Sequence, residues 1–205
     1  MKRIRSAIIS LSDKTNLKSL LHSLKKNNIK LISSGGTYKA IQKYGFNCLE
    51  VSKYTGTNEI LDGRVKTLHP KIHAGILHKR NNKKHLKEIK SNNYESIDLV
   101  IVNFYPFEKI LEKTKNPEKI IENIDIGGPS LVRAAAKNYN DVTVISSIEN
   151  YSELINELNT NKGKTSLNFR KKMSRIAFSE TAYYDSVIAS YFDNSSKIFF
   201  PKKKT

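Results

Sequence analysis

The first 150 residues alternate between short apolar runs and longer amphipathic segments. The apolar runs are nearly continuous and rich in β-branched residues, which is typical of strands that a sheet buries on both faces. On this pattern we predict strands at residues 4–12, 29–36, 46–52, 97–107 and 141–146.

The segments between these runs place apolar residues at helical spacing. Leucines between residues 17 and 24 recur on one helical face, and Ser12 or Asp13 stands ahead of them as a capping residue. A short helix that starts at Thr37 is expected to end at Gly45. We predict further helices at residues 83–93, 117–124, 130–138, 150–160 and 169–192, and a loop region over 54–80.

This alternation of strand and helix predicts βαβ units. The expected fold is therefore α/β, a doubly wound, mostly parallel sheet with helices on both faces. Ligands of such sheets bind at the carboxyl ends of the strands. We therefore expect four segments to converge, namely residues 10–15, 33–37, 103–105 and, after a helix, 125–128.

Length and cysteine content add few constraints. No linker is visible in the 205 residues, so we expect one domain over 1–195, followed by a basic tail or truncated linker at 196–205. The single cysteine, Cys48, allows no internal disulfide, which favours a reducing, cytoplasmic setting. The N-terminus lacks the features of a signal peptide, and no apolar run is long enough to span a membrane.

The charge is strongly positive. The chain has 36 Lys and Arg against 19 Asp and Glu, a formal net charge of +17. Such a charge suits a nucleic-acid binder or an enzyme with an anionic substrate. However, the lysines are scattered along the chain and do not cluster with aromatic residues. This scatter is typical of a protein that uses lysine at many surface positions, so a nucleic-acid partner is disfavoured. A positive field would still help to collect anions.

Two turns have the chemistry of a phosphate site. The segment SSGGT, residues 33–37, joins a predicted strand to a helix, and its glycines let backbone amides turn toward an anion. The segment SDKT, residues 12–15, repeats this arrangement and adds the Lys14 ammonium. The alternative is that these are ordinary helix-start residues. Two such turns on neighbouring strands favour the phosphate site.

The segment IDIGGPS, residues 124–130, places Asp125 ahead of a Gly-Gly-Pro turn into a helix, with Pro129 suited to the first helical position. Asp125 either caps this turn or forms an oxyanion-binding site with the free amides. Sequence alone leaves both interpretations open.

Other polar residues are less informative. Arg133 and Lys137 share a helix face, where solvated cations are usual. His69 and His73 are spaced one helical turn apart, but no third ligand or HExxH pattern accompanies them, so we expect no metal.

Taken together, the motifs of residues 5 to 193 resemble one family. They are SLSDKT, SSGGT, DGRVKTLHPKIHAG, NFYPF, IDIGGPSLVRAAAKN and AYYDSVIASYF. They are similar to the inosine monophosphate (IMP) cyclohydrolase portion of the bifunctional purine-biosynthesis family, which also carries an AICAR formyltransferase. The resemblance implies a methylglyoxal-synthase-like (MGS-like) fold. The formyltransferase domain, expected after residue 200, is absent from this sequence.

The resemblance implies that the chain closes the purine ring. The formylated ribonucleotide FAICAR would lose water to give IMP, the last step of de novo purine biosynthesis, with no cofactor. The chain would be a cyclohydrolase unit, excised or naturally separate. This leaves room for a homodimer and for a separate formyltransferase chain. The alternative is another phosphate-ligand protein of the same fold, such as a methylglyoxal synthase or a regulatory ligand domain, but these lack RVKTLHP.

The resemblance also implies a set of site residues. The 5′-phosphate would be held by Ser12, Asp13, Lys14, Ser34, Gly35, Gly36 and Thr37. The base and formyl end would be lined by Arg64, Val65, Lys66 and Thr67, on a loop that reaches over the substrate. Asn103, beside Val102, would hydrogen-bond the carboxamide, and Asp125, Ile126 and Gly127 would contact the reacting groups. Lys137 would donate and accept protons together with Tyr105; the expected catalytic set is Lys66, Tyr105, Asp125 and Lys137. Asp125 and Lys137 can share one substrate only if their helix lies along the pocket wall.

Overall fold

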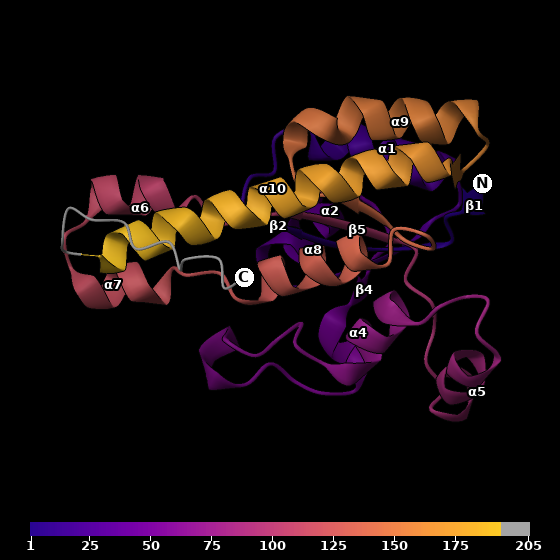
Figure 1. Cartoon of the computed structure of the whole chain (residues 1–205), viewed down its shortest axis with the longest axis horizontal. Coiled ribbons are helices and arrows are strands. Elements are labelled where there is room, and N and C mark those ends of the chain that lie inside the picture. The colour runs from indigo at the N-terminus through magenta and orange to yellow at the C-terminus, as the bar shows by residue number, and fades with distance from the viewer. Residues whose placement is uncertain (194–205) are drawn as a thin grey trace, which may run out of the picture.

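A computed structural model describes residues 1–193; the predicted tail at 196–205 lies outside the described residues. Its centre is a five-stranded parallel sheet in the order β4-β3-β2-β5-β6 (Figure 1). A separate antiparallel pair joins β1 to β7. The strands are β1 (Lys2–Arg3), β2 (Ser6–Leu11), β3 (Lys30–Ser33), β4 (Leu49–Glu50), β5 (Leu99–Asn103), β6 (Thr143–Ile145) and β7 (Lys164–Thr165). The predicted α/β fold is confirmed.

Helices surround the sheet. They are α1 (Leu17–Lys26), α2 (Gly35–Lys43), α3 (Val51–Thr55), α4 (Pro70–Leu77), α5 (Lys83–Ser91), α6 (Phe107–Lys113), α7 (Pro117–Glu122), α8 (Gly127–Lys137), α9 (Tyr151–Thr160) and α10 (Leu167–Phe192), with 3₁₀ turns at Leu61–Gly63 and Ile148–Asn150. α8 packs on β5 and β6 together with α10 and α4, while α1 packs against α9. No helix among the described residues is long and apolar enough to cross a membrane.

The central strand β2 explains the strongest sequence signal. Ala7 pairs with Leu31 on β3 and with Leu99 on β5, so neighbouring strands flank β2 on both edges. Ala7, Ile8 and Ile9 are completely buried. A strand covered on both faces needs apolar residues at consecutive positions, and this is why the run reads as continuous rather than alternating.

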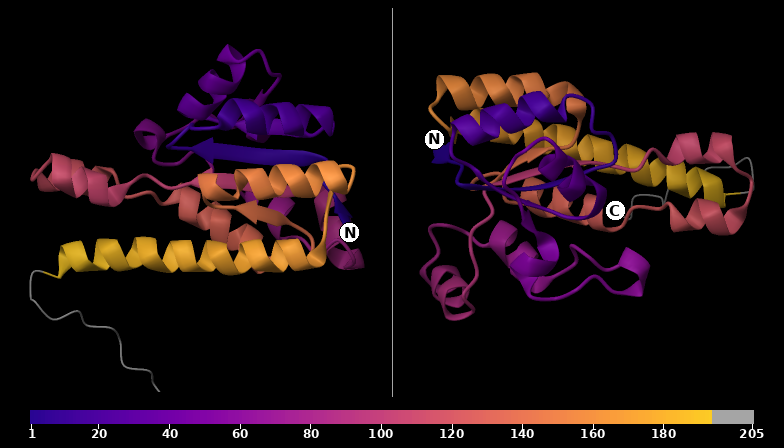
Figure 2. Two further views of the ribbon diagram at one scale, coloured as in Figure 1. Left: turned by 90° about the horizontal axis from the view of Figure 1, so that it is seen from above. Right: turned by 180° about the vertical axis from the view of Figure 1, so that it is seen from behind.

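A second, smaller apolar cluster lies beyond the sheet. It is formed by Phe107, Ile120 and Tyr184, where α6 and α7 pack near the C-terminal half of α10. In Figures 1 and 2 these three elements project together from one end of the molecule. The linker between β5 and α8 thus forms an arm supported by α10.

The structure corrects several predicted elements. The predicted strand at 46–52 is reduced to the two residues of β4, because α3 begins at Val51. The predicted loop region over 54–80 contains α4, where His69 caps the helix by accepting a hydrogen bond from the Lys71 amide (3.1 Å) and Pro70 occupies the first position. Helix α6 was not predicted.

Two predicted helix starts are also wrong. Helix α1 begins at Leu17 after Asn16, which adopts a left-handed conformation (φ 61°), so neither Ser12 nor Asp13 caps it. Helix α8 begins at Gly127, which makes Pro129 its third residue rather than its first.

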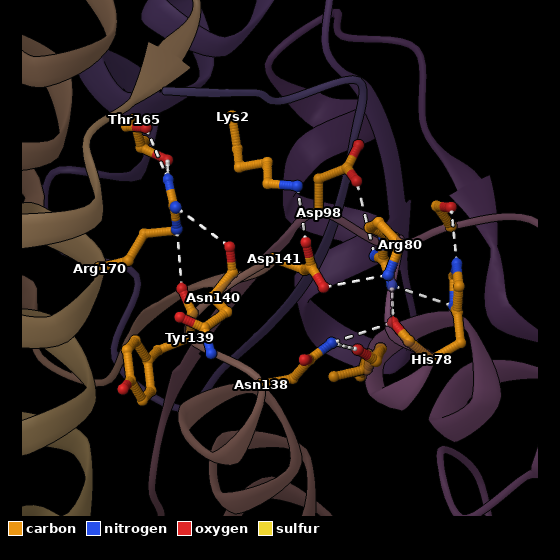
Figure 3. A network of polar contacts seen from close by, with 12 residues as sticks. Lys2, His78, Arg80, Asp98, Asn138, Tyr139, Asn140, Asp141, Thr165 and Arg170 are labelled. Carbon is orange, nitrogen blue, oxygen red and sulfur yellow. Dashed lines mark hydrogen bonds and ion pairs between the residues drawn. The ribbon is translucent and has the colours of Figure 1, made fainter. Parts of the chain in front are cut away.

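Arg80 is the centre of a polar network at the amino edge of the sheet (Figure 3). Its guanidinium donates to the carbonyls of Gly75 (3.1 Å) and Ile97 (2.9 Å) and lies 3.6 Å from the Asp98 carboxylate. The Arg80 amide donates to Asp141 (3.0 Å), which also pairs with Lys2. The network therefore ties the segment after α4 to the starts of β5 and β6.

Candidate active site

A cleft of about 650 Å³ opens at the carboxyl edge of the sheet. Its size is typical of a small-molecule site. The structure brings most of the predicted site residues to this cleft. They are Ser12, Lys14, Ser34, Gly35, Gly36, Thr37, Arg64, Lys66, Thr67, Asn103, Tyr105, Asp125, Ile126 and Gly127. The segments come from the ends of β2, β3 and β5, the loop before α4 and the turn into α8, as expected for a parallel sheet.

Three predicted contacts face elsewhere. The Asp13 carboxylate accepts the Thr15 amide (2.8 Å), and its hydrogen bonds from Thr15 lower the pKa of Asp13. Val102 is buried inside β5. Val65 closes its own loop by exchanging backbone hydrogen bonds with Ile60. These residues shape the surrounding segments and do not line the cleft.

The start of α2 has the properties of an anion site. Gly35 adopts φ +54°, which favours glycine, and it directly follows Ser34 at the N-terminus of the helix. The Lys14 ammonium lies 3.8 Å from the position that a Cβ on Gly36 would occupy, and the Lys66 ammonium lies 3.4 Å from the same position on Gly35. Two cations therefore flank a helix N-terminus, whose free amides and dipole attract an anion.

Two predicted ligands instead hold the cleft together. The Thr37 hydroxyl is buried, accepts the Leu11 amide (2.9 Å) and donates to the Leu11 carbonyl (3.1 Å), which fixes α2 to the end of β2. The Asn103 side chain accepts the amides of Ser12 (2.7 Å) and Asp13 (3.0 Å) and donates to the Asp13 carbonyl (2.7 Å). In this structure Asn103 therefore clamps the turn after β2, instead of offering its amide to a carboxamide.

Asp125 lies at the turn into α8. Its carboxylate accepts the Gly128 amide (2.8 Å), and a Cβ on Gly128 would come within 2.4 Å of a carboxylate oxygen, so any other residue there would displace the Asp125 carboxylate. Burial raises the pKa of Asp125, and hydrogen bonds from the amides of Gly128 and Tyr105 oppose this rise. Asp125 therefore caps the turn, and burial gives its carboxyl a perturbed pKa of the kind found at functional sites. The oxyanion-binding interpretation stays a prediction.

The loop before α4 pairs its cations with carboxylates. Lys66 forms an ion pair with Glu59 (2.7 Å). Arg64 pairs with Glu122 at the end of α7, with 3.2 Å between Nε and Oε1. These exposed pairs connect the loop to itself and to the α6–α7 arm. Neither glutamate was predicted from the sequence, and no spacing pattern links Arg64 to a residue 58 positions away.

Lys66 and Thr67 lie at different parts of the cleft. The Lys66 ammonium is beside the α2 turn, whereas a Cβ on Gly127 would come within 2.8 Å of the Thr67 hydroxyl oxygen. Lys66 therefore adjoins the predicted phosphate end in this structure, in contrast to the expected base end. Thr67 adjoins the turn that carries Asp125.

Lys137 is a predicted catalytic residue that does not line the cleft. It is the last residue of α8 and is exposed, whereas Gly127 at the first position of the same helix lines the cleft. Ten helical steps separate them, which is about 15 Å along the axis. Of α8, Gly127 and Gly128 are the residues that line the cleft.

Comparison with known proteins places this geometry in a family. The sequence profile of the MGS-like domain matches residues 16–130, more than half of the chain. The chain belongs to the MGS-like domain family. A second profile, that of the AICARFT/IMPCHase bienzyme, matches residues 135–205.

The relatives of this MGS-like domain agree with both profiles. The chain is 44% identical over 200 residues to the bifunctional purine biosynthesis protein PurH of Bradyrhizobium diazoefficiens, and the match covers 98% of this chain and 38% of that protein. It is 46% identical to PurH of Leptospira biflexa, covering 100% and 40% respectively. The chain thus spans about two fifths of the length of these relatives. The resemblance to the IMP cyclohydrolase portion of this family is confirmed.

A solved structure, described as the crystal structure of ForH, has the same fold. It aligns with a TM-score of 0.81 at 28% identity, covering 92% of this chain and 99% of that chain. The methylglyoxal-synthase-like fold predicted from the motifs is therefore confirmed.

Proposed function

We propose that this chain is an IMP cyclohydrolase, which converts FAICAR to IMP and water. The observation that carries the proposal is that one cleft contains both the anion-binding turn of α2 and the Asp125 turn of α8. A purine ribonucleotide needs both features, because its phosphate is a dianion and its ring closure requires proton transfer. We propose residues 1–195 as the catalytic unit.

The reaction forms one carbon–nitrogen bond and breaks one carbon–oxygen bond. The carboxamide nitrogen of FAICAR attacks the formyl carbon, and negative charge develops on the formyl oxygen. That oxygen then leaves as water, with one hydrogen from the carboxamide nitrogen and one from the formamido nitrogen. The protein must therefore align two groups of one substrate, accept a proton, return it, and stabilise an oxyanion.

We assign the residues to these tasks by their positions in the cleft. Lys14 and Lys66, with the amides of Gly35 and Gly36, would hold the 5′-phosphate. Ser12 and Ser34 line the same end.

The ring end would be formed by the Asp125 turn. Asp125 would accept a proton from the carboxamide, and the amides of Ile126 and Gly127 would face the formyl oxygen. Thr67 and Tyr105 adjoin this turn, and Arg64 would reach the ring after leaving Glu122.

The direct test is turnover of FAICAR by the purified chain, followed by the absorbance of IMP. Catalytic formation of IMP is expected. Retained phosphate binding without turnover of FAICAR would favour the alternative, another phosphate-ligand protein of the same fold. Assaying dihydroxyacetone phosphate in parallel would identify a methylglyoxal synthase.

The phosphate assignment predicts a strong effect of Lys14. Replacing Lys14 by alanine should weaken binding of IMP about 10- to 100-fold, because a charge-assisted contact to a dianion is lost. Isothermal titration calorimetry measures this affinity. Lys39→Ala is the matched control, since Lys39 is an exposed residue of helix α2, whose N-terminus Lys14 flanks, and its loss changes the net charge equally. Equal losses in both variants would indicate general charge attraction instead of a phosphate site.

We propose that Lys137 acts in catalysis within a homodimer. It does not line the cleft of its own chain, so a second copy would present Lys137 to the neighbouring site. Mixing the variants Lys137→Ala and Asp125→Asn would then restore about a quarter of the wild-type activity, since half of the dimers are mixed and each contains one intact site. Absence of recovery, with mixed dimers formed, would remove Lys137 from the catalytic set. The source of FAICAR would be a formyltransferase, on a separate chain or on another part of the same protein.

A further inference from the structure

The Asp125 turn is held from a distant part of the chain. The hydroxyl of Tyr184, on α10, accepts a hydrogen bond from the backbone amide of Asp125 at 2.8 Å. The two residues are 59 positions apart. Asp125 is thereby fixed at two points, through its backbone amide by Tyr184 and through its carboxylate by the Gly128 amide.

Packing fixes the position of the Tyr184 ring. Tyr184 is 7% exposed and belongs to the second apolar cluster. Its ring centroid lies 5.1 Å from that of Phe104 and 6.5 Å from that of Phe107, in tilted and edge-on arrangements. Because these neighbouring rings restrict the Tyr184 ring, its hydroxyl is held at the Asp125 amide. The arm of α6, α7 and α10 thus sets the position of the Asp125 turn.

Apart from the Tyr105 amide, which also faces the Asp125 carboxyl, the other hydrogen bonds of the turn come from residues close to it in sequence. Ile126 is 59% exposed, and Asp125 is linked to the start of α8 by its own carboxylate. Without the Tyr184 hydroxyl, the peptide between Ile124 and Asp125 could rotate and carry the carboxylate with it. Catalytic groups tolerate little displacement, and an error of 1 Å can cost about 100-fold in rate.

We propose that Tyr184 is a positioning residue for Asp125 and that the second apolar cluster exists in part to hold it. This inference rests on the proposed function insofar as it concerns catalysis. The positioning itself is a property of the ligand-free protein and can be measured without substrate.

The alternative is that Tyr184 is simply a core tyrosine whose hydroxyl has found an acceptor or donor nearby. That alternative predicts a loss of stability without any change in kcat or in the titration of the Asp125 carboxyl. The groups that face Asp125 are the Gly128 amide from α8, the Tyr105 amide after β5 and the Tyr184 hydroxyl from α10, with the Asp185 charge next to that hydroxyl.

The test is the variant Tyr184→Phe, which keeps the ring and removes only the hydroxyl. We expect kcat for FAICAR to fall about 10- to 100-fold, while KM changes less than about twofold because the phosphate end is untouched. In nuclear magnetic resonance spectra of the ligand-free protein, the Asp125 amide should shift and the Asp125 carboxyl should titrate at a different pH. Tyr191→Phe is the matched control, because Tyr191 packs edge-on against the same Phe107 ring.

The outcomes separate the two claims. Unchanged kcat and an unchanged Asp125 amide in Tyr184→Phe would overturn the positioning role, as would equal effects of Tyr191→Phe on both quantities. If the wild-type chain does not convert FAICAR, the proposed function fails, and the Asp125 amide and carboxyl signals alone decide whether Tyr184 positions the turn.

Discussion

Replacing Asp125 by asparagine is expected to lower kcat for ring closure about 100-fold or more, since a positioned general base contributes 10²- to 10⁴-fold. Asparagine has nearly the same shape, and its carbonyl oxygen can still accept the Gly128 amide, so the turn into α8 should persist. What is lost is the negative charge that would accept the carboxamide proton. Steady-state kinetics with FAICAR measure the effect, and calorimetry should show an unchanged affinity for inorganic phosphate. A matched loss of charge at an exposed carboxylate away from the cleft, Glu88→Gln on α5, should leave kcat within about twofold.

The same residue predicts the pH dependence of the rate. Because burial raises the pKa of Asp125 above its ordinary value of 3.8, the active carboxylate form should be lost at a higher pH than for an exposed aspartate. The acidic limb of the kcat profile should follow this raised pKa and disappear in Asp125→Asn. An acidic limb that is unchanged in the variant would assign it to another group.

The raised pKa also has a stability consequence with a definite sign. A carboxyl whose folded-state pKa is raised contributes stability that is fully present below the unfolded-state pKa and is lost as the pH rises through the folded-state value. At neutral pH the ionised Asp125 therefore opposes folding. Asp125→Asn should therefore raise the free energy of unfolding relative to the wild type, and this difference should be larger at pH 7 than at pH 4. A gain of this kind is usual when a functional group is removed from a buried site.

The fold could be predicted from sequence because its core is encoded locally. Ala7, Ile8 and Ile9 are apolar at consecutive positions, and burial on both faces of a parallel strand is the arrangement that such a run favours. The phosphate turn was equally accessible, since Gly35 and Gly36 follow a strand and start a helix. Sequence patterns therefore reveal the features that are formed by residues close to one another in the chain.

Contacts between distant segments could not be predicted in this way. No pattern in the sequence indicates that Asn103 clamps the turn of Ser12 and Asp13, or that Tyr184 reaches Asp125. Helix α4 was overlooked because its first turn is polar, and the capping role of His69 depends on a ring orientation that spacing does not specify. For Lys137, the helix length already indicated a long distance from Asp125 for a shared substrate. In the fold the two residues lie at opposite ends of α8.

The network around Arg80 predicts the largest effect on stability. Replacing Arg80 by methionine should lower the free energy of unfolding by about 3 kcal/mol or more, because removing one partner leaves buried charge and carbonyl groups without compensation. The side chains of Arg80 and Asp98 belong to the network of Figure 3 and are only 14% and 13% exposed. The lost hydrogen bonds include those to the carbonyls of Gly75 and Ile97. Urea denaturation followed by circular dichroism measures this difference.

Lys172→Met serves as the control for this prediction. Lys172 pairs with Glu153 at 2.8 Å, but the two side chains are 49% and 38% exposed, so the pair should contribute less than about 1 kcal/mol. Since Arg80 lies at the amino edge of the sheet and the cleft at the carboxyl edge, the folded Arg80→Met protein should retain its kcat. Comparable destabilisation by both variants would mean that burial does not set the strength of the Arg80 network. A fall in kcat of the folded protein would mean instead that the network, through α4, also holds the loop of Arg64 and Lys66 over the cleft.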